Sequence, residues 1–278
     1  MLDKLESATN IAQKITSPNF TKRSNSNGGY SIIGGRNESV LKSVPAKIKK
    51  FRRKEFGLNH LLASQSESDF ARLMPHSENI LFSGGEYLYQ SDEHNKYVYF
   101  PETAVISHLC TLADGKTVEI AMVGREGASG LCAVLGLQPS MHCAQITVAG
   151  SAIRIKTEIL KREFERGGKL QTLLLNYINT HISQISQGIV CKSFHFIEER
   201  LCSWLLMLHD RAQSSQWQMT HEQISLFLGV NRPTLTHAAK HLREKGFIDY
   251  SRGKFLILNR QGLEFGACEC YSAVQNIH

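Results

Sequence analysis

The segment of residues 219–260 constrains the fold of this 278-residue chain more than any other. It reads MTHEQISLFLGVNRPTLTHAAKHLREKGFIDYSRGKFLILNR. Apolar residues at helical spacing lead to Gly229, which can turn at positive φ, and Asn231 is suited to N-cap a second helix. Pro233 falls in the first turn of that helix, where a missing N–H is tolerated. The second helix has an apolar stripe at Leu235, Ala238, Ala239 and Leu242. A hairpin pattern follows it, so the segment predicts a winged helix-turn-helix.

The opposite face of the second helix is predicted to contact DNA. The start of a recognition helix lies deepest in the major groove, so Arg232, Thr236 and His237 are the base-reading candidates. Arg232 is the strongest, because a guanidinium can bind guanine O6 and N7 together, worth about 1–3 kcal/mol of discrimination. The predicted DNA-binding residues are Thr220, Asn231, Arg232, Thr234, Thr236, His237, Lys240, Arg252 and Lys254. His237 and His241 have a zinc-ligand spacing, but the motif holds no third ligand, so no metal is expected there.

These motifs resemble the Crp/Fnr regulators, the family of the cyclic-AMP receptor protein and the fumarate and nitrate reduction regulator. The pattern T-x-E-x-I-x-x-x-L-G-V-x-R, continued by L-x-x-x-G-x-I-x-Y-S-R-G and a final I-L, fits Thr220 through Leu258, and the resemblance covers about residues 58 to 271. The family reads DNA with an Arg, a Glu and a second Arg on this helix. Arg232 matches the first, whereas Pro233 replaces the Glu and His237 replaces the second Arg. The resemblance therefore implies an operator different from the usual one.

Upstream, short runs rich in Val, Ile, Tyr and Phe alternate with turn residues, which predicts an antiparallel β-roll or barrel. The runs are residues 87–89, 97–100, 105–112, 117–123, 145–148 and 152–155. Asp114 and Gly115 give a hairpin turn signal between two of them. The Crp/Fnr resemblance implies a β-roll sensor domain at this place. The expected fold class is α+β: a β-roll like that of cyclic-nucleotide-binding domains, a long dimerisation helix and a C-terminal winged helix-turn-helix.

Cyclic AMP is not the expected effector. Cyclic-nucleotide binders of this family place a Glu after a glycine and an Arg before a Ser or Thr and an Ala, whereas residues 141–144 read Met-His-Cys-Ala. An unknown small-molecule effector is considered instead, and no cofactor is otherwise expected. Its speculative contact residues are Gly124, Arg125, Glu126, Gly127, His142 and Cys143. The glycines at 124, 127 and 130 do not have the spacing or strand-to-helix context of a dinucleotide fingerprint, so turn glycines are the favoured interpretation.

The seven cysteines are dispersed, odd in number and not accompanied by a secretory segment, which favours a reduced cytoplasm. The chain has no CxxC motif and lacks the N-terminal cysteine cluster of iron–sulfur relatives. Cys268 and Cys270 are the one close pair. They could bind a metal or oxidise, but two packed or exposed thiols are the simpler interpretation.

Residues 169–192 carry an apolar stripe with heptad spacing, formed by Leu175, Ile178, Ile182, Ile185 and Ile189. This stripe predicts a homodimer, which would place two recognition helices on half-sites about one helical turn apart. The expected domains are a disordered basic tail (1–57), a β-roll (58–168), a dimerisation helix (169–193) and the DNA-binding domain (194–278). The tail holds 12 basic and four acidic residues, so it could add salt-sensitive attraction to DNA; a solvated extension is the alternative.

The sequence thus predicts a bacterial, cytoplasmic, homodimeric transcription regulator rather than an enzyme. Double-stranded DNA is the expected partner, RNA polymerase is a further candidate, and no run of about 20 apolar residues indicates a membrane span. Two alternatives remain open. One is a ligand-independent DNA-binding dimer with a purely structural roll. The other is a metal-dependent cupin-like enzyme with an accessory DNA domain, in which His108 and His142 would be the nearest ligands.

Overall fold

The computed structural model describes residues 59–137 and 139–276. The basic tail predicted for residues 1–57 lies outside them. The described chain begins with short helices α2 (His60–Ala63), α3 (Glu67–Leu73) and the 3-10 turn η2 (Met74–His76). Seven strands follow: β1 (Ser77–Phe82), β2 (Tyr87–Tyr89), β3 (Tyr97–Pro101), β4 (Val105–Thr111), β5 (Thr117–Val123), β6 (Cys143–Val148) and β7 (Gly150–Lys156). A second 3-10 turn, η3 (Leu131–Ala133), separates β5 from β6.

These strands form two antiparallel sheets, ordered β1-β7-β3 and β2-β6-β4-β5. A small apolar core between them takes Tyr99 from one sheet and Ile106, Val123 and Ile146 from the other. Several strands are buried over continuous runs, as in β3 and β4, because helices or the second sheet cover both of their faces. The predicted β-roll is confirmed, and the hairpin predicted at Gly115 is present with φ of 86°.

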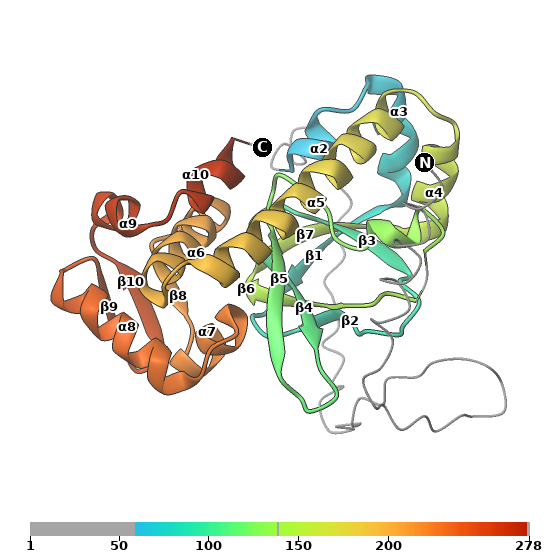
Figure 1. Cartoon of the computed structure of the whole chain (residues 1–278). Coiled ribbons are helices and arrows are strands. Elements are labelled where there is room, and N and C mark those ends of the chain that lie inside the picture. The colour runs from blue at the N-terminus through green and yellow to red at the C-terminus, as the bar shows by residue number, and fades with distance from the viewer. Residues whose placement is uncertain (1–58, 138, 277–278) are drawn as a thin grey trace, which may run out of the picture. The chain divides into compact units, whose positions relative to one another are not determined.

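Helices cover the three-stranded sheet. Phe100 and Ile153 of that sheet share a core with Leu160 of α4 (Thr157–Glu165) and Leu174 of α5 (Lys169–Phe194). The 26-residue α5 is the long helix in Figure 1, and it leads to α6 (Ile197–Ala212). It ends at Phe194, one residue after the predicted end of the dimerisation helix at residue 193. The Ser193 hydroxyl donates to the Ile189 carbonyl in the last turn, and the extended backbone begins at His195.

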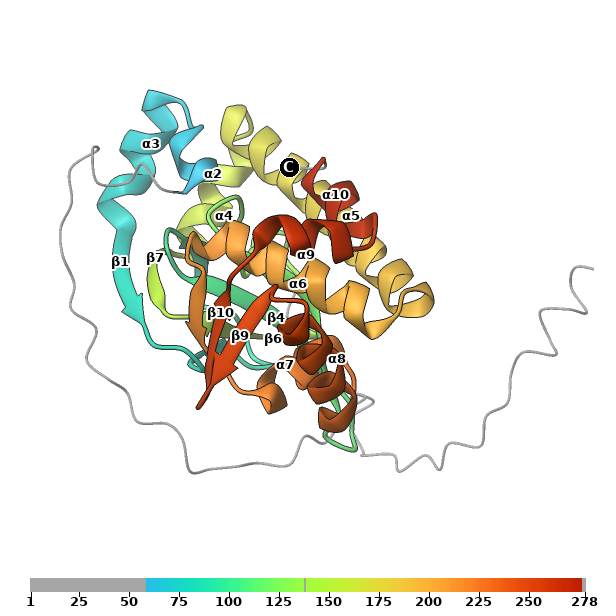
Figure 2. The same ribbon diagram turned by 90° about the vertical axis from the view of Figure 1, so that its left-hand side faces the viewer.

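The C-terminal elements are β8 (Gln216–Gln218), α7 (His221–Leu228), α8 (Arg232–Glu244), β9 (Ile248–Ser251), β10 (Lys254–Ile257), α9 (Arg260–Gly266) and α10 (Cys270–Gln275). Their sheet has the order β8-β10-β9, and Figure 2 shows it beside α7 and α8. The predicted stripe of α8 is buried, with its four residues at most 1% exposed. Leu201, Leu205 and Leu208 of α6 are fully buried in the same core.

Two strands were not expected from the sequence. Only Ile80 of β1 is buried, so the strand has no readable alternation of apolar and polar residues. The strand β8 has three residues, Gln-Trp-Gln, and is held by pairing with β10. In the described part of the chain, none of the helices has the length and hydropathy of a membrane span.

Candidate DNA-binding site

The two helices of the motif are joined by a sharply defined turn. Thr220 caps α7: its hydroxyl accepts the Gln223 N–H at 3.2 Å, and the Gln223 side chain accepts the Thr220 N–H at 2.9 Å. The helix ends at Gly229 with φ of 66°, and Asn231 accepts the Thr234 N–H at 2.9 Å to start α8. The predicted Asn231 cap and the positive-φ Gly229 are present, the Thr220 cap was not predicted, and these local interactions set the direction of α8.

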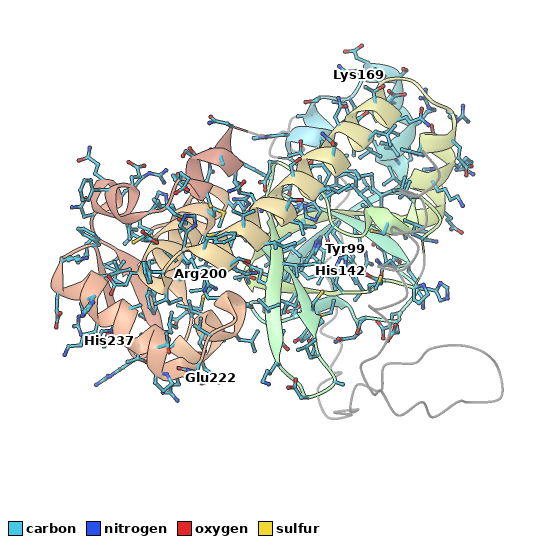
Figure 3. All side chains as sticks on the ribbon, viewed as in Figure 1. Tyr99, His142, Lys169, Arg200, Glu222 and His237 are labelled. Atoms are coloured by element: carbon cyan, nitrogen blue, oxygen red, sulfur yellow. The ribbon has the colours of Figure 1, made fainter. Side chains whose placement is uncertain are left out.

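All nine predicted DNA-binding residues are exposed. Five of them, from Arg232 to Lys240, lie on α8 opposite its buried stripe, and Thr220 and Asn231 sit at the helix starts, where their side chains also serve as caps. Figure 3 labels Glu222 and His237 on this part of the molecule. The motif therefore presents one polar, cationic surface.

Two of the base-reading candidates already have partners within the protein. The Arg232 Nε lies 3.9 Å from Glu222 Oε2, and both side chains are about two-thirds exposed. The Thr236 hydroxyl lies 3.1 Å from His221 Nδ1. Burial, and secondarily the charge of Arg232, lowers the pKa of His221. Exposed ion pairs of this kind are weak, so Arg232 can exchange Glu222 for another partner at little cost.

The hairpin after α8 forms the predicted wing. Arg252 and Gly253 have φ of 48° and 79°, as a two-residue type I′ turn requires. The Gly253 carbonyl accepts the Met219 N–H at 2.6 Å, which ties the tip to the start of the motif. Arg252 and Lys254 are exposed there, so the tip is cationic.

His237 has a neighbourhood that the motif alone did not reveal. Its ring centroid lies 4.3 Å from that of His241, whose Nδ1 is 2.6 Å from Glu198 Oε1. The third potential ligand missing from the motif thus comes from α6. Glu198 lies 43 positions before His241 in the chain, and no sequence spacing connects the two.

Comparison with known proteins supports the motif. The family model of the Crp-like helix-turn-helix domain matches residues 199–265. Solved structures share the wider fold. A protein from Eubacterium rectale described as a Crp/Fnr family transcriptional regulator is 16% identical, with TM-score 0.61 over 74% of this chain and 97% of its own. Residues 199–265 thus match a Crp-like helix-turn-helix domain, and the described chain shares the fold of a Crp/Fnr family regulator.

Two further solved structures share this fold. FixK2 from Bradyrhizobium japonicum is 18% identical, with TM-score 0.57 over 69% of this chain and 98% of its own. The c-di-GMP-responsive regulator CLP from Xanthomonas campestris is 11% identical, with TM-score 0.56 over 69% and 99%. No curated protein matches the sequence at a significant level.

In the β-roll, the predicted effector turn at residues 124–127 packs against helices. Glu126 Oε1 accepts the Gly124 N–H at 3.0 Å and the Arg211 Nε–H at 2.8 Å. A Cβ on Gly127 would lie 2.2 Å from the Tyr177 hydroxyl of α5. The turn thus touches α5 and α6, and its glycines are needed for close approach.

The two remaining effector candidates have different surroundings. The buried Cys143 thiol donates to the Leu109 carbonyl at 3.6 Å and belongs to the core shared with α6. His142, labelled in Figure 3, points instead toward Tyr89 in the roll interior, with Nε2 3.3 Å from the Tyr89 hydroxyl. The structure does not bring the six candidates together around one cavity.

A buried polar network of histidines occupies that interior. His108 Nε2 lies 2.7 Å from the Ser129 hydroxyl, and its Nδ1 lies 3.2 Å from His181 Nε2 of α5. Burial, reinforced by the neighbouring imidazoles, holds the pKa of His108 well below its ordinary value. The His108 and His142 rings are 4.5 Å apart, but neither belongs to a metal-ligand group found among the described residues. The network links the roll to α5, and sequence spacing gave no signal for His181.

The long helix α5 has one face turned to the roll and one left uncovered. Leu170, Leu174 and Tyr177 are buried on the first face. Of the predicted stripe, Leu175, Ile182 and Ile189 are 47%, 58% and 63% exposed, and Ile178 and Ile185 are half-buried. Exposed apolar rows of this extent on a helix are typical of an interface.

Proposed function

We propose that this Crp/Fnr-type regulator binds operator DNA as a homodimer, with α8 of each subunit in the major groove. The observation that carries the proposal is the exposed face of α8, whose opposite face is fully buried and whose start is fixed by the Asn231 cap. The wing with Arg252 and Lys254 adds a cationic contact for the neighbouring phosphates.

Within this surface, Arg232, Thr236 and His237 read bases, and Thr234, Lys240, Arg252 and Lys254 contact phosphates. Thr220 and Asn231 hold the helix starts and offer their exposed backbone and side chains to the DNA backbone. Residues 58–168 serve as the roll domain, 169–193 as the dimerisation helix and 194–278 as the DNA-binding domain. The uncovered apolar row on α5 supports self-association, because a partner copy of the same helix would cover it.

The roll takes an effector other than cyclic AMP. Residues 141–144 hold no arginine to pair a cyclic phosphate, and Glu126 is engaged by Arg211 of α6. Titration calorimetry with cyclic AMP is expected to give no saturable heat. If no small molecule of any class changes operator affinity, the roll serves only as a support for the dimer.

The DNA assignment is tested by selecting an operator from random sequence and comparing two variants on it. Arg232→Ala is expected to lose about 5- to 150-fold in affinity and to relax preference at one base pair. Lys240→Ala is expected to weaken binding to all sequences and to reduce the salt slope by about 0.9.

The matched control is Lys161→Ala, which removes the same charge from the exposed part of α4. It should leave both affinity and salt slope near those of the wild type. If Arg232→Ala loses affinity equally for every sequence, Arg232 is a phosphate contact and the base-reading assignment is wrong.

A further inference from the structure

Four potential metal ligands meet where α5 ends. Cys191 lies on the last turns of α5 and His195 is the residue after it, whereas Cys268 and Cys270 come from the segment that begins α10. The ligand atoms of these four side chains all lie within 4.8 Å of one another. The helix α10 lies beside α5 in Figure 1 and Figure 2. Cys191 and Cys268 are 77 residues apart in the chain, so the sequence showed only the Cys268 and Cys270 half.

We propose that Cys191, His195, Cys268 and Cys270 form a tetrahedral zinc site. This site is independent of the proposed DNA-reading roles and goes beyond them. Three cysteines and one histidine are among the ligand sets of closed, structural zinc sites.

The spacing of the donor atoms suits a single zinc ion. Zinc bonds of about 2.3 Å to sulfur and about 2.0 Å to nitrogen place tetrahedral donors about 3.8 Å apart for two sulfurs and about 3.5 Å for sulfur and nitrogen. Cys191 Sγ and Cys268 Sγ are 3.5 Å apart, and Cys270 Sγ and His195 Nδ1 are also 3.5 Å apart. Small outward movements of the sulfurs would complete the tetrahedron. A cluster with several irons would need its thiolates further apart.

Surrounding groups orient the donors as they do in zinc proteins. His195 turns Nδ1 toward the cysteines, while its Nε2 lies 3.2 Å from the carboxylate of Glu269. A carboxylate on the far nitrogen of a ligating histidine fixes its tautomer and raises its basicity. The Gln187 amide donates to Cys270 Sγ at 3.0 Å, and the Ser203 hydroxyl lies 3.2 Å from Cys268 Sγ. Donors to sulfur stabilise thiolates.

Burial and charge also favour a bound cation with thiolates. Cys268 and Cys270 are 7% and 4% exposed, so water reaches them poorly. Zinc with three thiolates and a neutral imidazole would carry one net negative charge. Arg200, itself half-buried, lies close enough for its charge to interact with Cys191 and Cys268. A cation that compensates the complex is therefore already in place.

A disulfide between Cys191 and Cys268 is the competing interpretation. A disulfide would involve only two of the four side chains. It would not explain why His195 and Cys270 are directed toward the same point. The other group of potential ligands, Glu198 with His237 and His241, is a weaker candidate because it contains no sulfur. Glu198 there already pairs with His241 at 2.6 Å and Lys245 at 3.8 Å.

The position of the site gives it a structural role. It joins the end of α5, which carries the proposed dimer face, to the segment that follows the wing of the DNA-binding domain. Bound zinc would fix α10 against α5 and α6, so metal loss would loosen the DNA-binding domain relative to the helix that sets the distance between two subunits. Zinc binds only the folded arrangement of these four residues, so it would also raise the melting temperature.

The test uses the full chain, purified without chelator from cells grown with added zinc. Elemental analysis is expected to find about one zinc per chain. After replacement of zinc by cobalt, the absorption spectrum is expected to show tetrahedral d–d bands together with sulfur-to-cobalt charge transfer. Cys270→Ser and His195→Ala should lose the metal or shift these bands.

Two controls distinguish this site from the remaining metal-binding groups of the chain. Cys132→Ser removes an exposed cysteine outside the cluster, and the pair His237→Ala with His241→Ala removes the second candidate group. Both should keep the full zinc content, and metal content is measured without DNA, so a failure of the DNA assignment would not affect this result. Since Cys270→Ser could misfold, cobalt titration of the wild-type protein stripped of metal provides an independent readout.

Three results would overturn the proposal: a chain without zinc that gives no thiolate–cobalt bands, a Cys270→Ser variant that keeps the metal with unshifted cobalt bands, or stoichiometric iron. A fourth would do the same. A Cys191–Cys268 disulfide in the protein purified under non-reducing conditions would show that the cluster is a redox pair instead.

Discussion

Ile182→Glu should break the proposed dimer. Ile182 is 58% exposed in the single chain. Complete burial of such a side chain is worth about 1.5–3 kcal/mol, so covering its exposed part contributes about 1–1.7 kcal/mol. A two-fold interface uses the residue twice, giving about 2–3.5 kcal/mol. The dimer dissociation constant should therefore rise by at least about 30- to 400-fold, and desolvation of the introduced carboxylate adds to this.

Sedimentation velocity over a range of protein concentrations measures that constant directly. The matched control is Leu112→Glu, because Leu112 is 65% exposed but lies in the turn after β4 and not on α5. The control should dimerise like the wild type. The reasoning is refuted if Ile182→Glu dimerises with an unchanged dissociation constant, or if the wild-type chain is a monomer at all concentrations tested.

Three further predictions concern stability, each measured by urea unfolding. Arg211→Ala removes the partner of Glu126 in an ion pair whose side chains are 6% and 17% exposed, and it should lower the free energy of unfolding by about 3 kcal/mol. A loss below about 1 kcal/mol would show that the pair is not effectively buried. Gly229→Ala should lower the free energy of unfolding by about 1–3 kcal/mol, because φ at this position is 66° and the new Cβ would lie 2.9 Å from Val118. Adding Val118→Ala should restore only the part of this loss that comes from the contact. Full restoration would contradict the argument from the backbone conformation. The pKa of His108 in the folded chain lies well below 6.5, so the unfolded chain binds more protons in acid and the free energy of unfolding should fall as pH drops below about 6.5. His108→Gln should make the free energy of unfolding depend less on pH in this range. An unchanged dependence would assign the effect to other groups.

The sequence predicted local structure best where several signals coincided. In the helix-turn-helix, Gly229, Asn231 and the buried stripe of α8 each indicated the same arrangement, and all three are present. The strands of the roll were likewise predicted where apolar runs are bounded by turn residues. The strand β1 was missed because one residue of its six is buried, so burial gave it no period.

Long-range proximity was the part that sequence spacing could not supply. The effector candidates were chosen from neighbouring positions in the chain. Cys143 nevertheless faces the core shared with α6, whereas the adjacent His142 contacts Tyr89 in the roll interior. His142 precedes β6, whose first residue is Cys143, so adjacent positions at a strand start have different partners. His181 and Cys191 lie on α5 far from their partners in sequence, and the heptad pattern describes only the other face of that helix.

The tip of the wing has a charged residue in a backbone conformation that is unfavourable for it. Arg252 is held at φ of 48°, a left-handed conformation that disfavours a side chain with a Cβ by about 1–2 kcal/mol and that asparagine or glycine adopts more readily. An arginine at this place is a poor choice for folding the hairpin. Glycine or asparagine would fold the turn more readily, but either would remove the exposed cation that the tip now holds beside the recognition helix.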